Sequence, residues 1–211
     1  MKLQLALDTV NVEEAILMMH QCQKWVDIIE IGTPMLIEYG LDAVRKMKQE
    51  FPEHLVLADA KIMDAGELEA NMCFLAGADI VTVLGVSHPT TIANTVKAAT
   101  KHGKMIMVDM IDVEDIKAKT KLIDKLGVDF ICVHTAFDLQ GEQSEPLAEL
   151  EIVNQVINKS KSAVAGGVKL ATIENVVSYK PDVIVVGGGI TNQDEPAKAA
   201  QRIKEIMEKE Q

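Results

Sequence analysis

Aromatic residues are scarce in this chain, and its balance of charge is strongly acidic. Phenylalanine, tyrosine and tryptophan make up 3% of the 211 residues, so the stacking platforms that bind single-stranded nucleic acid are almost absent. The excess of acidic residues gives a formal net charge of -11 at pH 7, which repels phosphate backbones. We therefore expect no nucleic-acid partner.

Cysteine is also scarce, and long apolar runs are missing. Cys22, Cys73 and Cys132 are far apart and form no CxxC pair, which argues against a zinc site and a disulfide framework. Cys132 lies in an apolar run and is expected to be a small buried side chain. No apolar stretch approaches the length of a membrane span, and no signal-peptide pattern opens the sequence. We expect a cytoplasmic protein with no membrane partner.

Eight short apolar runs alternate with longer segments of helical period. Continuous hydrophobicity within each run suits parallel strands that are covered on both faces. The spacing between successive runs leaves room for one helix and two short loops, as a βα unit requires. The runs are residues 3–7, 28–31, 55–58, 80–84, 105–108, 130–133, 163–165 and 183–186.

The segments between the runs carry helix signals. Asn11, Thr172 and Thr191 stand where helix caps are expected, and Asn11 precedes Glu14 by three residues. Gly77 and Gly127 are each expected to end a helix, and each is followed two residues later by an aspartate. Eight such units in one chain predict an α/β protein, a single (β/α)8 TIM barrel over residues 1–211. A doubly wound open sheet is the alternative.

Polar residues close most of the predicted strands. Asp8, Glu30, Asp59, Asp109 and His134 each stand at or near the end of an apolar run. In a barrel, the carboxyl ends of the strands and the loops after them build the active site. If the barrel closes, these five side chains meet at one mouth, which predicts a catalytic site there.

The segment 59–64 follows the third run and holds three charged residues. Asp59, Lys61 and Asp64 are costly at the end of a buried strand unless they pair with one another, a metal or a substrate. One interpretation is that Asp59 and Lys61 form a rim ion pair while Asp64 caps the next helix. The other is that all three belong to the site.

Glu30 and Asp59 lie on neighbouring predicted strands and are the candidate metal ligands. Hard divalent cations take oxygen ligands, and Mg²⁺ commonly keeps waters beside one or two carboxylates. The alternative is a hydrogen-bonded polar cluster in which one carboxyl has a raised pKa.

His134 is the one histidine at a predicted strand end, which makes it the candidate general acid or base. Its competing role is a core histidine bonded to a carbonyl. The other histidines fall in predicted helices or loops and are expected at the surface; they are His20, His54, His88 and His102.

Glycine clusters follow the seventh and eighth runs. Backbone N–H groups in such loops can surround a phosphate, a recurring feature of barrels. The alternative is that each cluster is a tight turn that needs positive φ. The predicted phosphate-binding glycines are Gly166, Gly167, Gly187, Gly188 and Gly189.

At these residues the sequence resembles a known family. The segment Asp59-x-Lys61-x-x-Asp64 matches the D-x-K-x-x-D signature of the orotidine-phosphate decarboxylase superfamily of barrels. Glu30 and His134, with their flanking residues, are similar to its metal-dependent branch. That branch contains 3-hexulose-6-phosphate synthases and 3-keto-L-gulonate-6-phosphate decarboxylases. The segments 108–111, 138–140 and 185–191 favour the synthases, and the resemblance covers essentially the whole chain.

The resemblance implies a role for each matching residue. Glu30 and Asp59 would hold Mg²⁺ or Mn²⁺ together with substrate oxygens, and Lys61 would stabilise negative charge on the sugar. Asp64 would reach across a homodimer interface into the partner's site. The remaining roles are substrate hydroxyl binding by Asp8, proton transfer by Asp109 and His134, and phosphate binding by Gly167, Gly188 and Gly189.

The resemblance also implies the reaction, an aldol addition of formaldehyde to ribulose 5-phosphate through an enediolate. The decarboxylases are the nearest alternative. Where their pattern has two arginines, this chain has Phe137 and Gly189, which weakens that alternative. A phosphopentose epimerase is more distant, and a non-catalytic sugar-phosphate-binding barrel is the alternative from another class.

Overall fold

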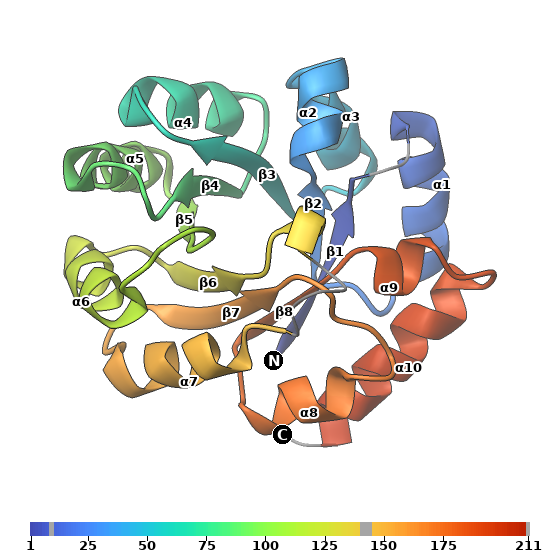
Figure 1. Cartoon of the computed structure of the whole chain (residues 1–211). Coiled ribbons are helices and arrows are strands. Elements are labelled where there is room, and N and C mark those ends of the chain that lie inside the picture. Colours follow the sequence, from blue (N-terminus) through green and yellow to red (C-terminus); the bar gives the residue numbers. More distant parts are fainter. Residues whose placement is uncertain (9–10, 140–144, 210–211) are drawn as a thin grey trace.

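A computed structural model describes residues 1–8, 11–139 and 145–209, and it closes the predicted strands into one parallel barrel (Figure 1). Strand order follows the sequence, and the last strand pairs with the first. The (β/α)8 TIM barrel is confirmed and the open sheet is excluded. The strands are β1 (Lys2–Leu7), β2 (Ile28–Ile31), β3 (Leu55–Ile62), β4 (Ile80–Leu84), β5 (Met105–Asp109), β6 (Phe130–His134), β7 (Lys161–Ala165) and β8 (Val183–Val186).

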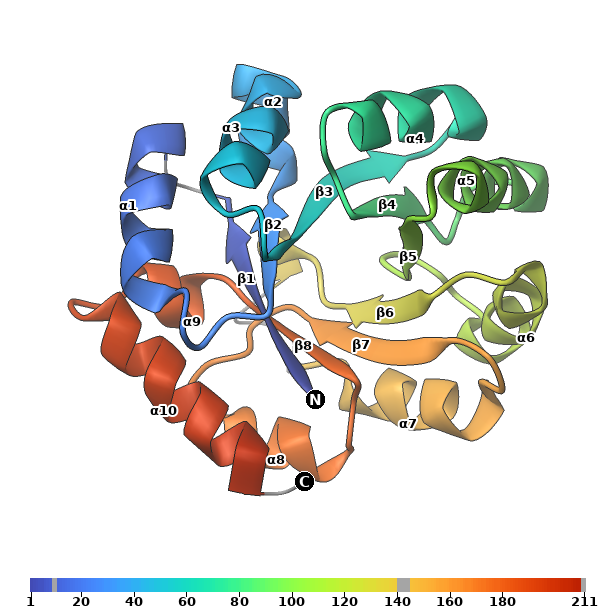
Figure 2. The same ribbon diagram turned by 180° about the vertical axis from the view of Figure 1, so that it is seen from behind.

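The helices surround the barrel, as the front and back views show (Figures 1 and 2). They are α1 (Val12–Cys22), α2 (Thr33–Tyr39), α3 (Asp42–Glu50), α4 (Gly66–Leu75), α5 (Pro89–His102), α6 (Ile116–Leu126), the 3-10 turn η1 (Phe137–Leu139), α7 (Leu147–Val156), α8 (Ile173–Ser178), α9 (Gly188–Thr191) and α10 (Pro196–Lys209). Two connections hold two helices where one was expected, because α2 and α3 both follow β2, and α9 and α10 both follow β8. None of the described helices has the length and apolar composition that a membrane crossing requires.

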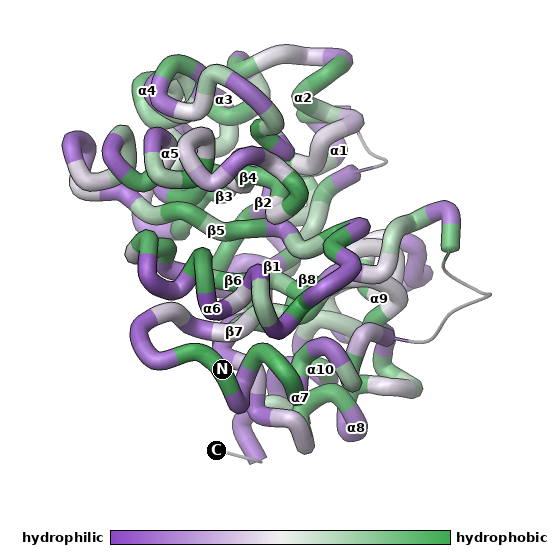
Figure 3. The backbone as a smooth tube through the Cα atoms, turned by 60° about the vertical axis from the view of Figure 1, so that its left-hand side comes forward, coloured by the Kyte–Doolittle hydropathy of each residue, from purple (hydrophilic) through white to green (hydrophobic). Residues whose placement is uncertain are grey.

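Alternate residues of each strand face two different cores. On β1, Leu3, Leu5 and Leu7 face the helices and belong to the larger apolar cluster, whereas Gln4 and Ala6 face the inside of the barrel. The smaller interior cluster is apolar toward the amino ends of the strands; it includes Ala6, Ile28, Leu57, Ile80, Met107 and Phe130. Figure 3 shows hydrophobic residues along the strands of the barrel, and hydrophilic residues interrupt them on β1, β2 and β3. Polar interior residues therefore gather at the opposite, carboxyl end.

The third strand is longer than its apolar run predicts. It continues past Ala58 through Ile62, so Asp59 and Lys61 lie within a strand, and the expectation that the strand ends before them is wrong. Its pairing with β4 jumps from Ala58 opposite Val81 to Ile62 opposite Val83. This irregularity is a bulge, which bends a strand and changes where its side chains point.

The predicted helix ends are mostly confirmed. Asn11 caps α1 in a capping box with Glu14. Gly127 ends α6 with φ of 82°, and Gly77 follows α4 with φ of 108°. Thr172 stands at the N-cap of α8 but makes no side-chain cap bond. Thr191 is not a cap, because it ends α9 and the next helix begins only at Pro196.

Four aspartates form a repeated clamp at the amino end of the barrel. Each precedes an even-numbered strand, and its carboxylate accepts a hydrogen bond from a backbone N–H of the odd-numbered strand before it. The pairs are Leu3 with Asp27 (2.7 Å), Val56 with Asp79 (2.9 Å), Ile106 with Asp129 (2.8 Å) and Ser162 with Asp182 (2.9 Å). We call this set the floor clamps. They explain why an aspartate follows both Gly77 and Gly127.

Candidate active site

Lys61 lies at the centre of a line of ionisable side chains from three strands, which we call the charged line after its ammonium and carboxylates. Its Nζ atom is 2.6 Å from Oδ2 of Asp59 and 3.2 Å from Oδ2 of Asp109. On the other side of Asp109, Nδ1 of His134 lies 2.9 Å from the same carboxylate oxygen. The structure thus brings four predicted site residues together, and it contradicts the interpretation of His134 as a core histidine bonded to a carbonyl.

The backbone at Lys61 is strained. Its φ is 45°, in the left-handed region that a residue with a long side chain rarely adopts. Such a conformation costs about 1–3 kcal/mol and persists where the surrounding structure enforces it, often at functional sites. The bulge in β3 therefore turns the Lys61 ammonium back toward Asp59.

Burial and neighbouring charges shift the pKa values of Lys61 and Asp109 in opposite directions. Burial acts to lower the pKa of Lys61, but the charges of Asp59 and Asp109 outweigh it and raise that pKa. Burial likewise acts to raise the pKa of Asp109, but the hydrogen bond from His134 and the charge of Lys61 hold it below its usual range. Lys61 is accordingly a protonated cation at neutral pH, suited to stabilising negative charge and unsuited to forming a Schiff base.

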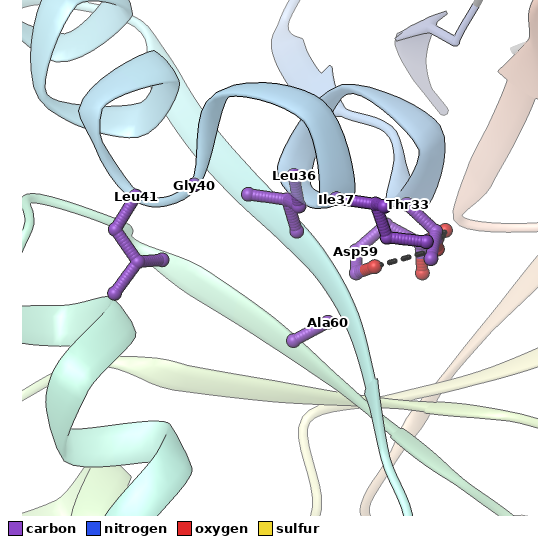
Figure 4. A pocket seen from close by; sticks show the side chains of 7 residues that line it. All are labelled: Thr33, Leu36, Ile37, Gly40, Leu41, Asp59 and Ala60. Atoms are coloured by element: carbon purple, nitrogen blue, oxygen red, sulfur yellow. Dashed lines mark hydrogen bonds between the residues drawn. The ribbon is translucent and has the colours of Figure 1, made fainter.

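The ion pair of Asp59 with Lys61 forms as one interpretation predicted, but its place at the rim is wrong, because Asp59 is only 4% exposed. Its Oδ1 atom accepts a hydrogen bond from the Thr82 hydroxyl (2.8 Å). Its Oδ2 atom lies 2.8 Å from the Thr33 hydroxyl, the contact drawn in Figure 4. Thr33 begins α2, so a helix outside the barrel and a neighbouring strand both orient this carboxylate.

Glu30 is a buried carboxyl group inside the barrel. Its Oε2 atom accepts a hydrogen bond of 2.6 Å from the Gln4 side chain. Burial and the charges of Asp59 and Asp8 raise the pKa of Glu30 well above its usual value, against the opposing effects of Gln4 and Lys61. Several carboxyl groups thus face one nearby lysine, and this excess of oxygen donors and negative charge suits a hard divalent cation.

The ligand set that the described side chains offer is small. Within residues 1–8, 11–139 and 145–209, no three His, Cys, Asp or Glu side chains are grouped as metal ligands. A cation held by Glu30 and Asp59 would therefore complete its coordination with water and substrate oxygens, the arrangement common for Mg²⁺.

Asp8 closes β1 beside two glycines from other loops. A side chain at Gly32 would overlap Oδ1 of Asp8, and a Cβ atom at Gly187 would lie 3.5 Å from Oδ2. Burial and the charge of Asp59 raise the pKa of Asp8, while Lys61 and His134 act to lower it. Gly32 is thus needed for the close approach of α2 to Asp8, a role the sequence analysis did not assign.

The two glycine clusters differ in conformation. Gly166 and Gly167 have φ of 96° and 74°, so both adopt the positive φ of the tight-turn interpretation. Gly187 has φ of -100° and is followed by the short helix α9, which begins at Gly188. A Cβ atom at Gly189 would lie 2.5 Å from the carbonyl oxygen of Val168, so the two loops pack backbone to backbone.

Asp64 does not cap a helix. Its Oδ1 atom accepts a hydrogen bond from the N–H of Ala65 (2.7 Å), and Ala65 itself occupies the N-cap of α4 with φ of 50° and no side-chain cap bond. The Asp64 side chain is exposed and joins neither Lys61 nor His134 within this chain. The structure thus removes the cap interpretation.

The remaining histidines and cysteines lie outside the charged line. His88 caps α5 by accepting from the N–H of Thr90 (3.2 Å), and the other three histidines contact surface or helix groups. The cysteines are free and buried, as expected for Cys132. The segment 138–140 was one of those that favoured the synthases, and its last residue, Gln140, lies outside the described residues.

Three polar residues of the site escaped the sequence analysis, namely Gln4, Thr33 and Thr82. Gln4 and Thr82 are single polar residues inside otherwise apolar strands, and both are nearly fully buried, at 1% and 3% exposed. A buried polar side chain needs a partner, so a lone polar residue in such a run was the signal that could have found them.

Comparison with known proteins assigns the chain to a family. Residues 1–203 match the family described as "Orotidine 5'-phosphate decarboxylase / HUMPS family". The chain belongs to this family. A relative from Bacillus subtilis (strain 168), named 3-hexulose-6-phosphate synthase, is 48% identical over 207 residues, covering 98% of this chain and 99% of the relative.

Solved structures of the family are also close in shape. The crystal structure of 3-hexulose-6-phosphate synthase from Salmonella typhimurium has a TM-score of 0.97 and 42% identity, with full coverage of both chains. A crystal structure of KGPDC from Streptococcus mutans has a TM-score of 0.91 but 25% identity, covering 99% of this chain and 97% of that one. The sequence is therefore nearer to the synthases within one shared fold.

Proposed function

We propose that the chain catalyses the reaction of 3-hexulose-6-phosphate synthases, a carbon–carbon lyase of the aldolase type. Ribulose 5-phosphate and formaldehyde are its substrates, and the reverse reaction is a retro-aldol cleavage. The observation that carries the proposal is the line of Lys61, Asp109 and His134, which joins a protonated cation to a carboxylate-oriented imidazole at the barrel mouth. The similarity to synthases over the whole chain supports it.

His134 is the proposed base. Asp109 engages its Nδ1 atom at 2.9 Å, so Nδ1 carries the proton and Nε2 is left to accept one. We assign to Nε2 the removal of a proton from C1 of ribulose 5-phosphate. The resulting enediolate attacks the carbon of formaldehyde, a C–C bond forms at C1, and the new alkoxide takes up a proton.

Lys61 stabilises the negative charge that develops on the enediolate. A charged group held in place before the reaction needs no reorganisation when that charge appears. Asp59 and Asp109 hold the Lys61 ammonium from two sides, at 2.6 and 3.2 Å, so its position is set without the substrate. Asp8, beside the same mouth, is assigned to substrate hydroxyl groups.

Glu30 and Asp59 are proposed to hold Mg²⁺ or Mn²⁺. Both are buried carboxyl groups facing the barrel interior, and burial together with the charges of Asp59 and Asp8 raises the pKa of Glu30. A divalent ion bound here would polarise the substrate oxygens and favour removal of the neighbouring proton. The chain's own contribution is the orientation of the two carboxylates by Gln4, Thr33 and Thr82.

The two glycine loops are proposed to bind the substrate phosphate. Gly166 and Gly167 lie after β7, and Gly187, Gly188 and Gly189 lie after β8, so the loops are neighbours on the mouth. Backbone N–H groups without side-chain obstruction can donate to phosphate oxygens. With Gly189 in place of an arginine, the phosphate depends more on these backbone donors.

An apolar face beside β3 supports a homodimer with shared active sites. Helix α4 is apolar on two sides, since Ala70, Cys73 and Phe74 are buried while Leu68, Met72 and Leu75 are exposed. An apolar side facing water marks an interface. We call the exposed residues Ile37, Met63, Leu68, Met72 and Leu75 the α2–α4 face.

A pocket and an acid adjoin the α2–α4 face. The pocket, of about 220 Å³, runs between α2 and β3 from Asp59 to Ile37, which is 81% exposed (Figure 4). Asp64 lies one residue after Met63 and has no role in its own site. We propose that a second copy of the chain covers this face and receives Asp64 into its own active site.

The decarboxylases share the enediolate and are the nearest alternative. The absence of both arginines of their pattern, at Phe137 and Gly189, favours the synthase. A non-catalytic sugar-phosphate-binding barrel would have no use for the strained, paired Lys61 or for a carboxylate-oriented His134.

One assay decides between these functions. Purified protein is incubated with formaldehyde and ribulose 5-phosphate, with Mg²⁺ or with EDTA, and formation of the hexulose 6-phosphate is followed. We expect turnover with Mg²⁺ and its loss with EDTA. No turnover with metal present, together with decarboxylation of 3-keto-L-gulonate 6-phosphate, would overturn the synthase assignment. No reaction with either substrate would favour the binding barrel.

A further inference from the structure

Thr82 is a hydroxyl side chain in the middle of the apolar strand β4. Its neighbours Val81 and Val83 are fully buried on the helix-facing side, while Thr82 faces the barrel interior and is 3% exposed. A buried hydroxyl group is destabilising unless it is hydrogen-bonded. A valine would satisfy the strand pattern equally well, so the hydroxyl group calls for its own explanation.

The hydroxyl group makes two hydrogen bonds, both to the charged segment of β3. The backbone N–H of Lys61 donates to Oγ1 of Thr82 at 2.9 Å. The hydroxyl proton is then donated to Oδ1 of Asp59 at 2.8 Å. The direction of both bonds follows from the groups involved, since an N–H can only donate and a carboxylate can only accept.

These bonds span the bulge in the β3–β4 pairing. The register passes from Ala58 opposite Val81 to Ile62 opposite Val83, so residues 59–61 lie opposite Thr82 alone. A regular ladder cannot satisfy three residues with one. At Lys61, whose φ is 45°, the Thr82 hydroxyl group accepts the N–H bond that a backbone carbonyl would accept in a regular ladder.

We propose that Thr82 is a positioning residue for the catalytic pair. It holds the Lys61 backbone in its left-handed conformation and, through the same oxygen atom, orients the Asp59 carboxylate. The ammonium of Lys61 thereby stays between Asp59 and Asp109. Thr82 acts through these two residues and not on the substrate. The kinetic part of this inference rests on the proposed function, whereas the backbone part does not.

Three variants test the kinetic part. Thr82→Val keeps the shape and removes the hydroxyl group, Thr82→Ser keeps the hydroxyl group, and Thr120→Val is the matched control. Thr120 is fully buried in α6, and its hydroxyl group has no hydrogen-bond partner among the described residues. We expect Thr82→Val to lower kcat about 10- to 100-fold, with a smaller change in KM for ribulose 5-phosphate. Thr82→Ser and Thr120→Val should turn over close to the wild-type rate.

Amide hydrogen exchange of Lys61, measured by NMR, tests the backbone part without any turnover. The Lys61 N–H bonds a buried oxygen atom, so it should exchange slowly in the wild type, in Thr82→Ser and in Thr120→Val. In Thr82→Val it should exchange about tenfold faster or more, because the bulge loses its acceptor. If the valine variant does not fold, Thr82→Ala serves, since it places no methyl group against the Asp59 carboxylate.

The outcomes separate this inference from the proposed function. Unchanged Lys61 exchange in the hydroxyl-free variant overturns the role of Thr82, whatever the kinetics. A serine variant as slow as the valine variant also overturns it. If the wild-type protein has no synthase activity, the proposed function fails, and the Lys61 exchange rates alone then decide for or against Thr82.

Discussion

The Nδ1 atom of His134 lies 2.9 Å from Oδ2 of Asp109, and this contact sets which imidazole nitrogen can act as a base. The same carboxylate lies 3.2 Å from the Lys61 ammonium. Asp109 therefore connects the group proposed to remove the proton with the group proposed to stabilise the resulting charge. Neither connection requires the substrate, so both are properties of the folded chain.

Asp109→Asn should lower kcat by about 10²–10⁴-fold while KM changes less. A carboxylate can only accept from His134, whereas the asparagine amide can accept or donate, so it no longer fixes the proton on Nδ1. The substitution also removes a negative charge beside Lys61. Steady-state rates at saturating ribulose 5-phosphate measure the effect. Asp112→Asn is the control, because Asp112 is an exposed acid in the loop that follows the same strand. Equal rates for both variants would contradict the role of Asp109.

Gln4→Met should weaken binding of Mn²⁺ in the absence of substrate, about 10- to 100-fold in Kd. Gln4 donates the hydrogen bond of 2.6 Å that orients Glu30, and methionine fills the same space without a donor. Titration by electron paramagnetic resonance reports free Mn²⁺ directly. Met107→Leu, which changes an interior side chain without removing a hydrogen bond to Glu30, should bind as the wild type does. An unaltered Kd in Gln4→Met would show that Glu30 needs no such support.

Mixed dimers test whether Asp64 completes the partner's site. Asp64→Ala and His134→Ala should each be nearly inactive alone. A dimer of one chain of each has one site with its own His134 and the partner's Asp64, so co-purified mixed dimers should recover activity. If Asp64 served its own chain, both sites of the mixed dimer would lack a residue and no activity would return.

Leu68→Glu should shift the protein from dimer to monomer, because it places a charge in the centre of the α2–α4 face. Sedimentation velocity gives the oligomeric state at several concentrations. Leu17→Glu is the matched control, since Leu17 on α1 is 63% exposed and Leu68 is 62% exposed. A wild-type protein that sediments as a monomer would remove the proposal of shared sites.

Acid should weaken the floor clamp at Asp79. Burial acts to raise its pKa, but hydrogen bonds from Lys104 and Lys48, at 2.5 and 2.8 Å, hold it below the usual 3.8. The folded-state pKa is depressed, so the stabilisation is present above the unfolded value and is lost as pH falls through the folded one.

Asp79→Asn should accordingly lower the free energy of unfolding at neutral pH by about 1–3 kcal/mol. Denaturant titration at a series of pH values should show that difference shrinking in acid. Asp42→Asn is the control, because Asp42 pairs with Arg45 on the surface and exposed pairs contribute about 0–1 kcal/mol. A constant difference at all pH values would contradict the depressed pKa.

Much of the site was predictable because strand ends meet in a barrel. Apolar runs located all eight strands, and the polar residues that close them led to Asp8, Glu30, Asp59, Asp109 and His134. That inference needs only the positions of the strands and the rule that their carboxyl ends share one face. It does not need the register of the strands or the hydrogen bonds of individual side chains.

The contacts of Lys61 could not be predicted in the same way. They depend on the register of β3 against β4, and a strand that is buried on both faces has no alternation from which to read its register. The bulge, the left-handed Lys61 and the hydrogen bonds of Thr82 all follow from that register. The contact of Thr33 with Asp59 comes from α2, the first of two helices after β2. This division was hidden because one spacing of residues can hold one helix or two.

The floor clamps lie at the opposite end of the strands from the charged line. Four aspartates tie the strands in successive pairs, and strands of four to eight residues separate them from the mouth. Engineering can therefore treat the two ends of this barrel as separate tasks. Heat tolerance can be sought by strengthening the aspartate–lysine contacts of the floor, while substrate range is altered only in the loops above.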